Sequence, residues 1–154
     1  MINDDYIVSV NVMKQHHELM GFVGERPIEL VRESERELGV IFPPSYRQFL
    51  LDFGAGNFGY FEIYGVIDNN FFHSSVPNGI WLTLLERTDS SLPNNLVIIA
   101  ATGDGDYYCL DCSNISGEEA PVILYSPSSN IILKGEIAKS FGQFLYNIVN
   151  SQLP

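Results

Sequence analysis

The sequence is poor in positive charge, and its few basic residues are unevenly spread. The 154 residues include 8 lysines and arginines against 19 aspartates and glutamates, which gives a formal net charge of −11. Between Arg47 and Lys134 the only basic residue is Arg87. A surface of this sign repels phosphate backbones and anionic lipids. We therefore expect neither a nucleic-acid-binding nor a membrane-binding protein.

A long apolar run is also missing. No segment approaches the roughly 18 to 20 consecutive apolar residues that span a bilayer. The first residues, Met1 to Asp5, are acidic where a secretory signal is basic, and no apolar stretch of the signal type follows them. We therefore expect a cytoplasmic protein. A chain of 154 residues, 45% of them hydrophobic, fits a single domain over residues 1–154 with a well-filled core.

Only two cysteines are present, Cys109 and Cys112, spaced as Cys-x-x-Cys. A redox pair of this type needs its first thiol at the start of a helix, where the dipole lowers the pKa, but Cys109 lies in a predicted strand. A structural zinc site needs two further ligands, and there is no second cysteine pair. We therefore interpret Cys109 as a small core residue, and we expect no metal and no cofactor.

Arrangements typical of catalysis are missing as well. The adjacent His16 and His17 point about 100° apart if they lie on a helix, so they do not chelate together, and we interpret His73 as a surface or turn residue. No Gly-x-Ser-x-Gly is present to mark a nucleophile. The glycines at Gly103 and Gly105 lack the Gly-Lys-Ser/Thr ending of a phosphate loop. We predict that the protein is not an enzyme.

The hydrophobic pattern predicts helices at both ends of the chain and mostly strands between them. Steps of three and four residues are typical of helices, and continuous or alternating apolar runs are typical of strands. Because helices and strands are segregated, the pattern favours an α+β fold over alternating βαβ units. Helices are predicted over residues 4–19, 27–38, 44–53, 80–87 and 140–148, and strands over 60–64, 96–101, 107–111, 121–125 and 131–133.

The segment Gly103-Asp104-Gly105-Asp106 joins two of these predicted strands. Alternating glycine and aspartate is typical of tight hairpins. Two carboxylates two residues apart could instead contact a partner, or form a metal or acid–base pair. The EF-hand pattern fails, because neither a third oxygen ligand nor a closing glutamate follows at its spacing. Hairpin geometry, a partner contact and a catalytic or metal role all stay open here.

Several short segments occur in an order and spacing that resemble the SUKH superfamily, specifically its Smi/Knr-type branch. The resemblance extends from about Pro27 to Ile148. The segments are Glu37-Leu38-Gly39 with Phe42-Pro43-Pro44-Ser45-Tyr46-Arg47, Phe53-Gly54-Ala55-Gly56, Ile63-Tyr64-Gly65, Gly103-Asp104-Gly105-Asp106-Tyr107 to Asp111 before Pro121-Val122, and Ser140-Phe141 with Phe144-Leu145.

The resemblance implies an α+β fold with a mixed, largely antiparallel sheet flanked by helices, and it implies no enzyme activity. Bacterial members commonly serve as immunity proteins against toxins that are often nucleases. Fungal members of the branch act as regulatory scaffolds in cell-wall assembly. The family has no fixed catalytic residues, so the resemblance assigns no active site.

Charge and resemblance together favour an immunity protein that binds and neutralises a cognate, basic toxin domain of nuclease type. Acidic surfaces steer and hold basic proteins, and nucleases are often basic because they grip phosphates. The alternatives are an interaction scaffold of the cell-wall-assembly type, and an acidity that only keeps the protein soluble. An outward Tyr60, Tyr64 or Phe71 would anchor the contact, with Trp81, Phe61 and Phe72 as further aromatic candidates. The expected partner-binding residues are Glu62, Tyr64, Asp68, Asp104, Asp106, Glu118 and Glu119.

Overall fold

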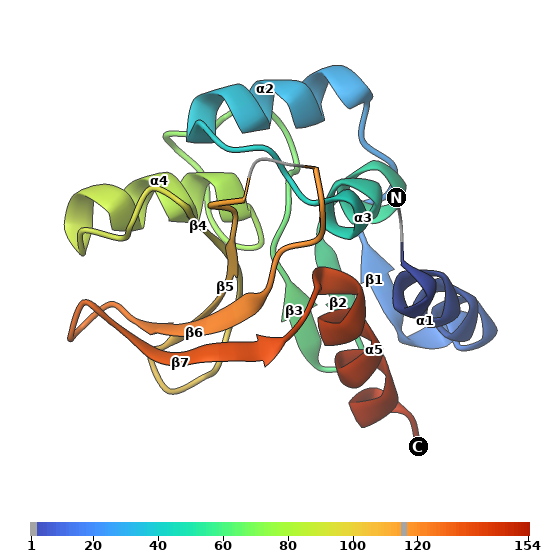
Figure 1. Ribbon diagram of the computed structural model, residues 1–154. Coiled ribbons are helices and arrows are strands. Elements are labelled where there is room, and N and C mark those ends of the chain that lie inside the picture. The colour runs from blue at the N-terminus through green and yellow to red at the C-terminus, as the bar shows by residue number, and fades with distance from the viewer. Residues whose placement is uncertain (1–2, 115–116) are drawn as a thin grey trace.

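Helices and two small antiparallel sheets make up the fold in the computed structural model, which describes residues 3–114 and 117–154 (Figure 1). The helices are α1 (Asp4–Gln15), the short 3-10 helix η1 (His17–Leu19), α2 (Ile28–Leu38), α3 (Pro44–Phe53), α4 (Gly79–Asp89) and α5 (Phe141–Gln152). The strands are β1 (Met20–Phe22), β2 (Gly56–Phe58), β3 (Phe61–Ile63), β4 (Leu96–Ala101), β5 (Tyr107–Asp111), β6 (Val122–Ser126) and β7 (Ile131–Ala138).

The strands form one sheet of order β1-β2-β3 and another of order β4-β5-β6-β7, each with antiparallel neighbours. The Tyr64 backbone N–H, just after β3, donates to the Ile99 carbonyl of β4 at 2.7 Å and joins the two sheets. The predicted α+β class is confirmed. The strand pairing is antiparallel, as the resemblance largely implies, but the strands form two sheets, and parallel pairing in the described residues is limited to the isolated bridge between Gly65 and Asn78.

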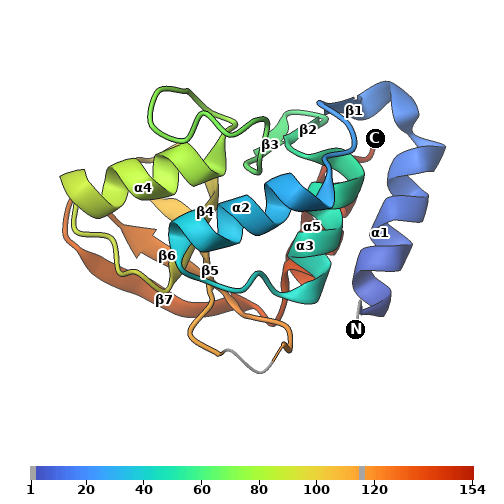
Figure 2. The ribbon, with the colours of Figure 1, turned by 90° about the horizontal axis from the view of Figure 1, so that it is seen from above.

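Strand β4 is buried on both faces, which explains its unbroken apolar sequence. Val97 and Ile99 belong to the main core cluster, whereas Leu96 and Ile98 belong to a second cluster. Successive side chains of a strand point to opposite faces, so both faces need apolar residues. Helix α4 lies against β4, and α2, α3 and α5 lie on the side of the main core (Figures 1 and 2).

Two glycines of the Smi/Knr-like segments are required by close backbone packing. Gly54, which ends α3, has a φ of 72°, a conformation that residues with a Cβ rarely adopt. A Cβ added to Gly65 would lie only 1.9 Å from the Gly54 carbonyl oxygen. Phe53-Gly54 and Tyr64-Gly65 therefore fit together as one contact, which brings the end of α3 against the end of β3.

Helix α1, which lies outside the resemblance, packs against α5 at the far end of the chain (Figures 1 and 2). Its N-cap Asn3 accepts from the Tyr6 N–H at 3.1 Å and donates to Ser140 Oγ at 2.7 Å. Ser140 in turn caps α5, as the sequence predicts. None of the helices among the described residues is long and apolar enough to cross a membrane.

Candidate functional site

The Gly103–Asp106 segment is the tight turn between β4 and β5, as the hairpin interpretation predicts. Gly103 and Gly105 have φ values of 92° and 93°. The Thr102 N–H donates to the Asp106 carbonyl at 3.0 Å, and the Asp104 N–H donates to Thr102 Oγ1 at 3.1 Å. These bonds hold the turn through its backbone. The Asp104 side chain is exposed and that of Asp106 is half-buried.

Strand β3 brings Glu62 beside this turn. A pocket of 340 Å³ lies between them, with Thr102 and Gly103 on one side and Tyr60 and Glu62 on the other. Tyr60 is fully exposed, at 103% of its reference area. Its backbone N–H donates to Gln152 Oε1 at 2.8 Å, so α5 holds the base of the side chain in place. We call Tyr60, Glu62, Asp104 and Asp106 the β3–turn surface.

Tyr64 is not outward, although it lines the same pocket. It is 7% exposed and belongs to the second core cluster. Burial, followed by the charge of Glu62, raises the pKa of its hydroxyl. Of each adjacent aromatic pair one member faces out, as expected, and the outward members are Tyr60 and Phe72. Phe71, at 4% exposure, is therefore also unavailable as an outward anchor.

Asp68, Glu118 and Glu119 do not join the β3–turn surface. Asp68 is exposed in the connection between β3 and α4, where its Oδ1 accepts from the Asn70 N–H at 2.9 Å. Glu118 and Glu119 lie between β5 and β6. In antiparallel neighbours the β4–β5 turn and the β5–β6 connection lie at opposite ends of β5, so these glutamates are a strand length away from Asp104.

The carboxylate of Glu119 is bound inside the fold, at the N-terminus of α3. It accepts from the Ser45 backbone N–H at 3.2 Å and from the Ser45 hydroxyl. The N-cap residue of α3, Pro43, provides no side-chain hydrogen bond of its own. Glu119 thus supplies from a distant loop the acceptor that a serine or aspartate N-cap normally provides. Sequence reasoning did not identify this role, because nothing near Glu119 in the chain signals a helix terminus.

Neither cysteine is placed for chemistry. Cys109 and Cys112 are both free thiols, and they are 0% and 5% exposed. Burial raises the pKa of Cys112 to about 12 and raises that of Cys109 as well, which is opposite to the shift of a reactive thiol. The interpretation of Cys109 as a core residue is confirmed. Within residues 3–114 and 117–154, no three His, Cys, Asp or Glu side chains are grouped as metal ligands.

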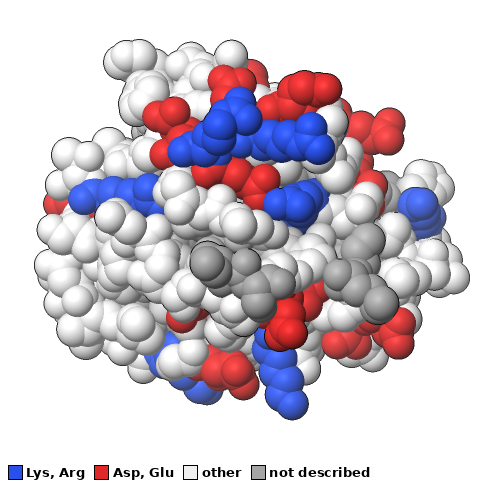
Figure 3. Space-filling view, turned by 45° about the horizontal axis from the view of Figure 1, so that its top comes forward, with Lys and Arg blue, Asp and Glu red and all other residues white. Residues whose placement is uncertain are grey.

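The two signs of charge are mixed over α2. Figure 3 shows Lys and Arg side chains lying among Asp and Glu side chains on this face. A shallow pocket there is lined by Arg32, Arg36 and Arg47 together with Glu35. Glu35 pairs with Arg47 and also accepts from the Phe42 N–H at 2.7 Å. Within α2, Arg32 and Arg36 lie among four glutamates, so this face carries both signs of charge.

Comparison with known proteins agrees with this architecture. A solved structure described as a protein from Pseudomonas syringae pv. tomato superposes with a TM-score of 0.66 at 20% sequence identity, covering 90% of this chain and 96% of that one. At this identity the likeness shows the fold alone. Among curated proteins none matches the sequence. The family model SUKH_6, described as SMI1-KNR4 cell-wall, matches residues 28–145. The chain therefore belongs to the SMI1-KNR4 family of the SUKH type.

Proposed function

We propose that the protein is a non-catalytic immunity protein, which binds a basic toxin domain of nuclease type through the β3–turn surface. The observation that carries this proposal is the fully exposed Tyr60 beside Glu62 and the aspartate turn, on a chain of net charge −11. A rigid aromatic with few rotatable bonds is a typical interface anchor. Surrounding carboxylates attract a cationic partner and favour the correct orientation.

The backbone of the β3–turn surface is held by hydrogen bonds, so the order lost on binding is mostly that of its side chains. Hydrogen bonds within the turn fix Asp104, and the bond to Gln152 fixes the Tyr60 backbone. Preorganised contact residues improve affinity because their freedom is already restricted before the partner arrives. Asp68 and Glu118, which are exposed elsewhere, would add long-range attraction without direct contact. Glu119 is left out of the proposed contact surface, because its carboxylate caps α3.

The test is binding to a toxin domain encoded beside this gene. We expect the two proteins to co-purify at low salt and to separate as the salt concentration rises. Replacing Glu62 and Asp104 together by lysine should weaken the complex about tenfold or more, mostly through slower association. The matched control replaces Glu29 and Glu37 on α2, both exposed, by lysine, because it makes the same change in net charge.

Two results would contradict the proposal. If the control variant weakens binding as much as the Glu62/Asp104 variant does, only net charge matters and the β3–turn surface has no special role. If no neighbouring toxin domain binds at any salt concentration, the immunity function itself is wrong.

A regulatory scaffold without a toxin is the second candidate, and the family description as cell-wall proteins favours it. A scaffold would use the same surface for a different protein. The neighbouring gene distinguishes the two, since an immunity protein is expected beside a large secreted toxin. Purification of stable complexes with cell-wall enzymes, in the absence of such a gene, would favour the scaffold.

A further inference from the structure

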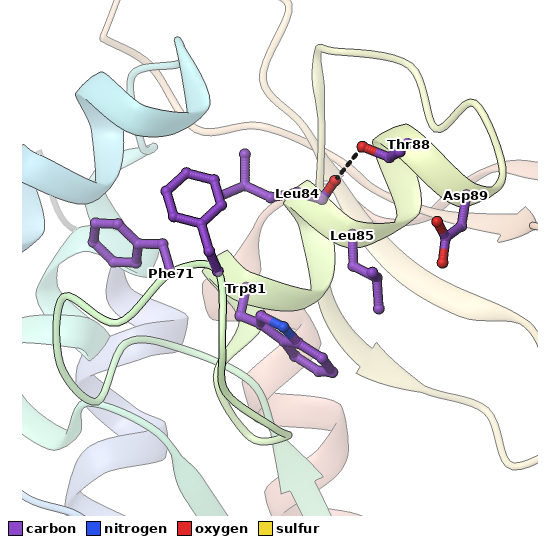
Figure 4. A pocket seen from close by; sticks show the side chains of 7 residues that line it. Phe71, Trp81, Leu84, Leu85, Thr88 and Asp89 are labelled. Atoms are coloured by element: carbon purple, nitrogen blue, oxygen red, sulfur yellow. Dashed lines mark hydrogen bonds between the residues drawn. The ribbon is translucent and has the colours of Figure 1, made fainter.

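An apolar pocket of 240 Å³ beside α4 has no part in the proposed function. Figure 4 shows its lining, with Phe71 contributed by the connection before α4 and the other labelled residues by α4 itself. Phe72 is 64% exposed and Leu85 36%, which leaves two large apolar side chains open to water. The lining residues are Phe71, Phe72, Trp81, Leu84, Leu85, Thr88 and Asp89.

The pocket continues along α4 as a stripe that changes from apolar to acidic. Trp81, Leu85 and Asp89 are four residues apart, so they share one face of the helix, with neighbours about 6 Å apart along its axis. Figure 4 shows these three side chains on the same side of α4. The Thr88 hydroxyl donates back to the Leu84 carbonyl at 3.5 Å and is therefore engaged within the helix.

Asp89 is a carboxylate that has no ion pair with the part of the chain that the structure describes. It is exposed. It is the last residue of α4, where the helix dipole already carries partial negative charge. Arg87, the only basic residue of this helix, instead donates to the Asn94 carbonyl at 2.8 Å. A cation from outside would therefore be attracted by both the carboxylate and the helix terminus.

We propose that this pocket binds a protein segment that carries a large apolar side chain followed, two residues on, by Lys or Arg. In an extended segment such side chains face the same way about 6.5 Å apart, which matches the spacing of Leu85 and Asp89. The volume of 240 Å³ is below the roughly 300 Å³ at which small-molecule sites begin and suits one side chain. The site goes beyond the proposed function, because it requires no toxin.

Trp81 is the only tryptophan of the chain, so its fluorescence reports directly on the pocket. The probe is the peptide acetyl-Phe-Gly-Lys-amide, with acetyl-Phe-Gly-Glu-amide and acetyl-Gly-Gly-Lys-amide as comparisons. We expect the first peptide to change the Trp81 emission saturably. The other two should bind about tenfold more weakly, one because its charge repels Asp89 and the other because it has no apolar anchor.

Variants separate the two parts of the site. Asp89→Asn should reduce the preference for the Lys peptide over the Glu peptide to what the helix terminus alone provides, whereas Phe72→Ser should weaken the binding of both peptides. Asp104→Asn, on the β3–turn surface, is the matched control and should change none of the titrations. The inference is overturned if no peptide changes the Trp81 emission, or if the Lys and Glu peptides bind the unmodified protein equally. Neither outcome bears on toxin binding, which the co-purification tests separately.

Discussion

Replacing Glu119 by alanine should destabilise the protein, although Glu119 lies in a loop. The carboxylate is the acceptor for the buried N-terminus of α3, where Ser45 is fully buried and Pro43 provides no side-chain cap. Alanine removes the acceptor, and among the described residues no other group accepts from the Ser45 N–H. The Ser45 hydroxyl keeps a second partner, since it also donates to Asn3 Oδ1 at 3.2 Å. The loss is therefore confined to the backbone N–H and the charge at the helix terminus.

The expected loss in the free energy of unfolding is about 2 kcal/mol. Losing an N-cap costs about 1 kcal/mol, and leaving a buried N–H without a partner costs about 1 to 3 kcal/mol. Both values describe the loss of the same hydrogen bond, so they are not added. Glu119→Gln keeps an amide oxygen as acceptor but loses the charge. The attraction between that charge and the helix dipole contributes about 0.3 to 1 kcal/mol. The free energy of unfolding of Glu119→Gln should therefore lie between that of the unmodified protein and that of Glu119→Ala.

Urea unfolding measures these differences, with Glu118→Ala as the matched control. Glu118 is exposed and one residue away, and its replacement should change the free energy of unfolding by less than about 0.5 kcal/mol. In thermal unfolding the Glu119→Ala variant should melt about 4 to 8 °C lower than the unmodified protein. If Glu119→Ala and Glu118→Ala are equally stable, the carboxylate does not cap α3 in solution, and Glu119 becomes available as a partner contact.

Three further predictions concern the core. Gly65→Ala should cost about 3 kcal/mol or more in urea unfolding because its Cβ would lie 1.9 Å from a backbone carbonyl, whereas Gly135→Ala, with nothing within 4 Å, should be nearly neutral. Tyr46→Phe should cost about 1 to 2 kcal/mol in the same assay, since its hydroxyl donates at 2.9 Å to a buried carbonyl; an unchanged midpoint would contradict this. Burial raises the pKa of Cys112 to about 12, so its stabilising contribution is complete below the unfolded-state pKa and is lost as the pH rises towards 12. Unfolding midpoints should therefore fall from pH 8 to pH 11, and less steeply in Cys112→Ala.

Elements with strong local signals could be predicted from the sequence. The structure has β4 and β5 with the predicted bounds, and α2 and α3 begin and end within one residue of the expected positions. Helix α1 is shorter than the predicted range of 4–19, because it ends at Gln15 and the separate helix η1 follows. Strands β1 and β2 were not predicted, because each has three residues and is stabilised by pairing with distant parts of the chain. Such short strands carry no periodic pattern of their own.

The candidate site was less predictable, because it depends on contacts between distant residues. Glu62 lies beside the β4–β5 turn because the end of β3 contacts β4, through the hydrogen bond from the Tyr64 N–H to the Ile99 carbonyl, and no local pattern signals this contact. The inward position of Tyr64 follows from the same contact. Composition gave the total charge, but it could not show that Glu119 is bound to Ser45.

The segments that carry the family resemblance lie mostly inside the molecule. Gly54, Gly65, Tyr46 and Phe141 are buried, and their roles are to join α3, β3 and α5. Tyr60, by contrast, projects from a turn whose backbone is fixed by its neighbours. Side chains on such turns can change without altering the core, since exposed substitutions usually affect stability little. One scaffold can therefore present different contact residues, and partner specificity has to be measured at the turns.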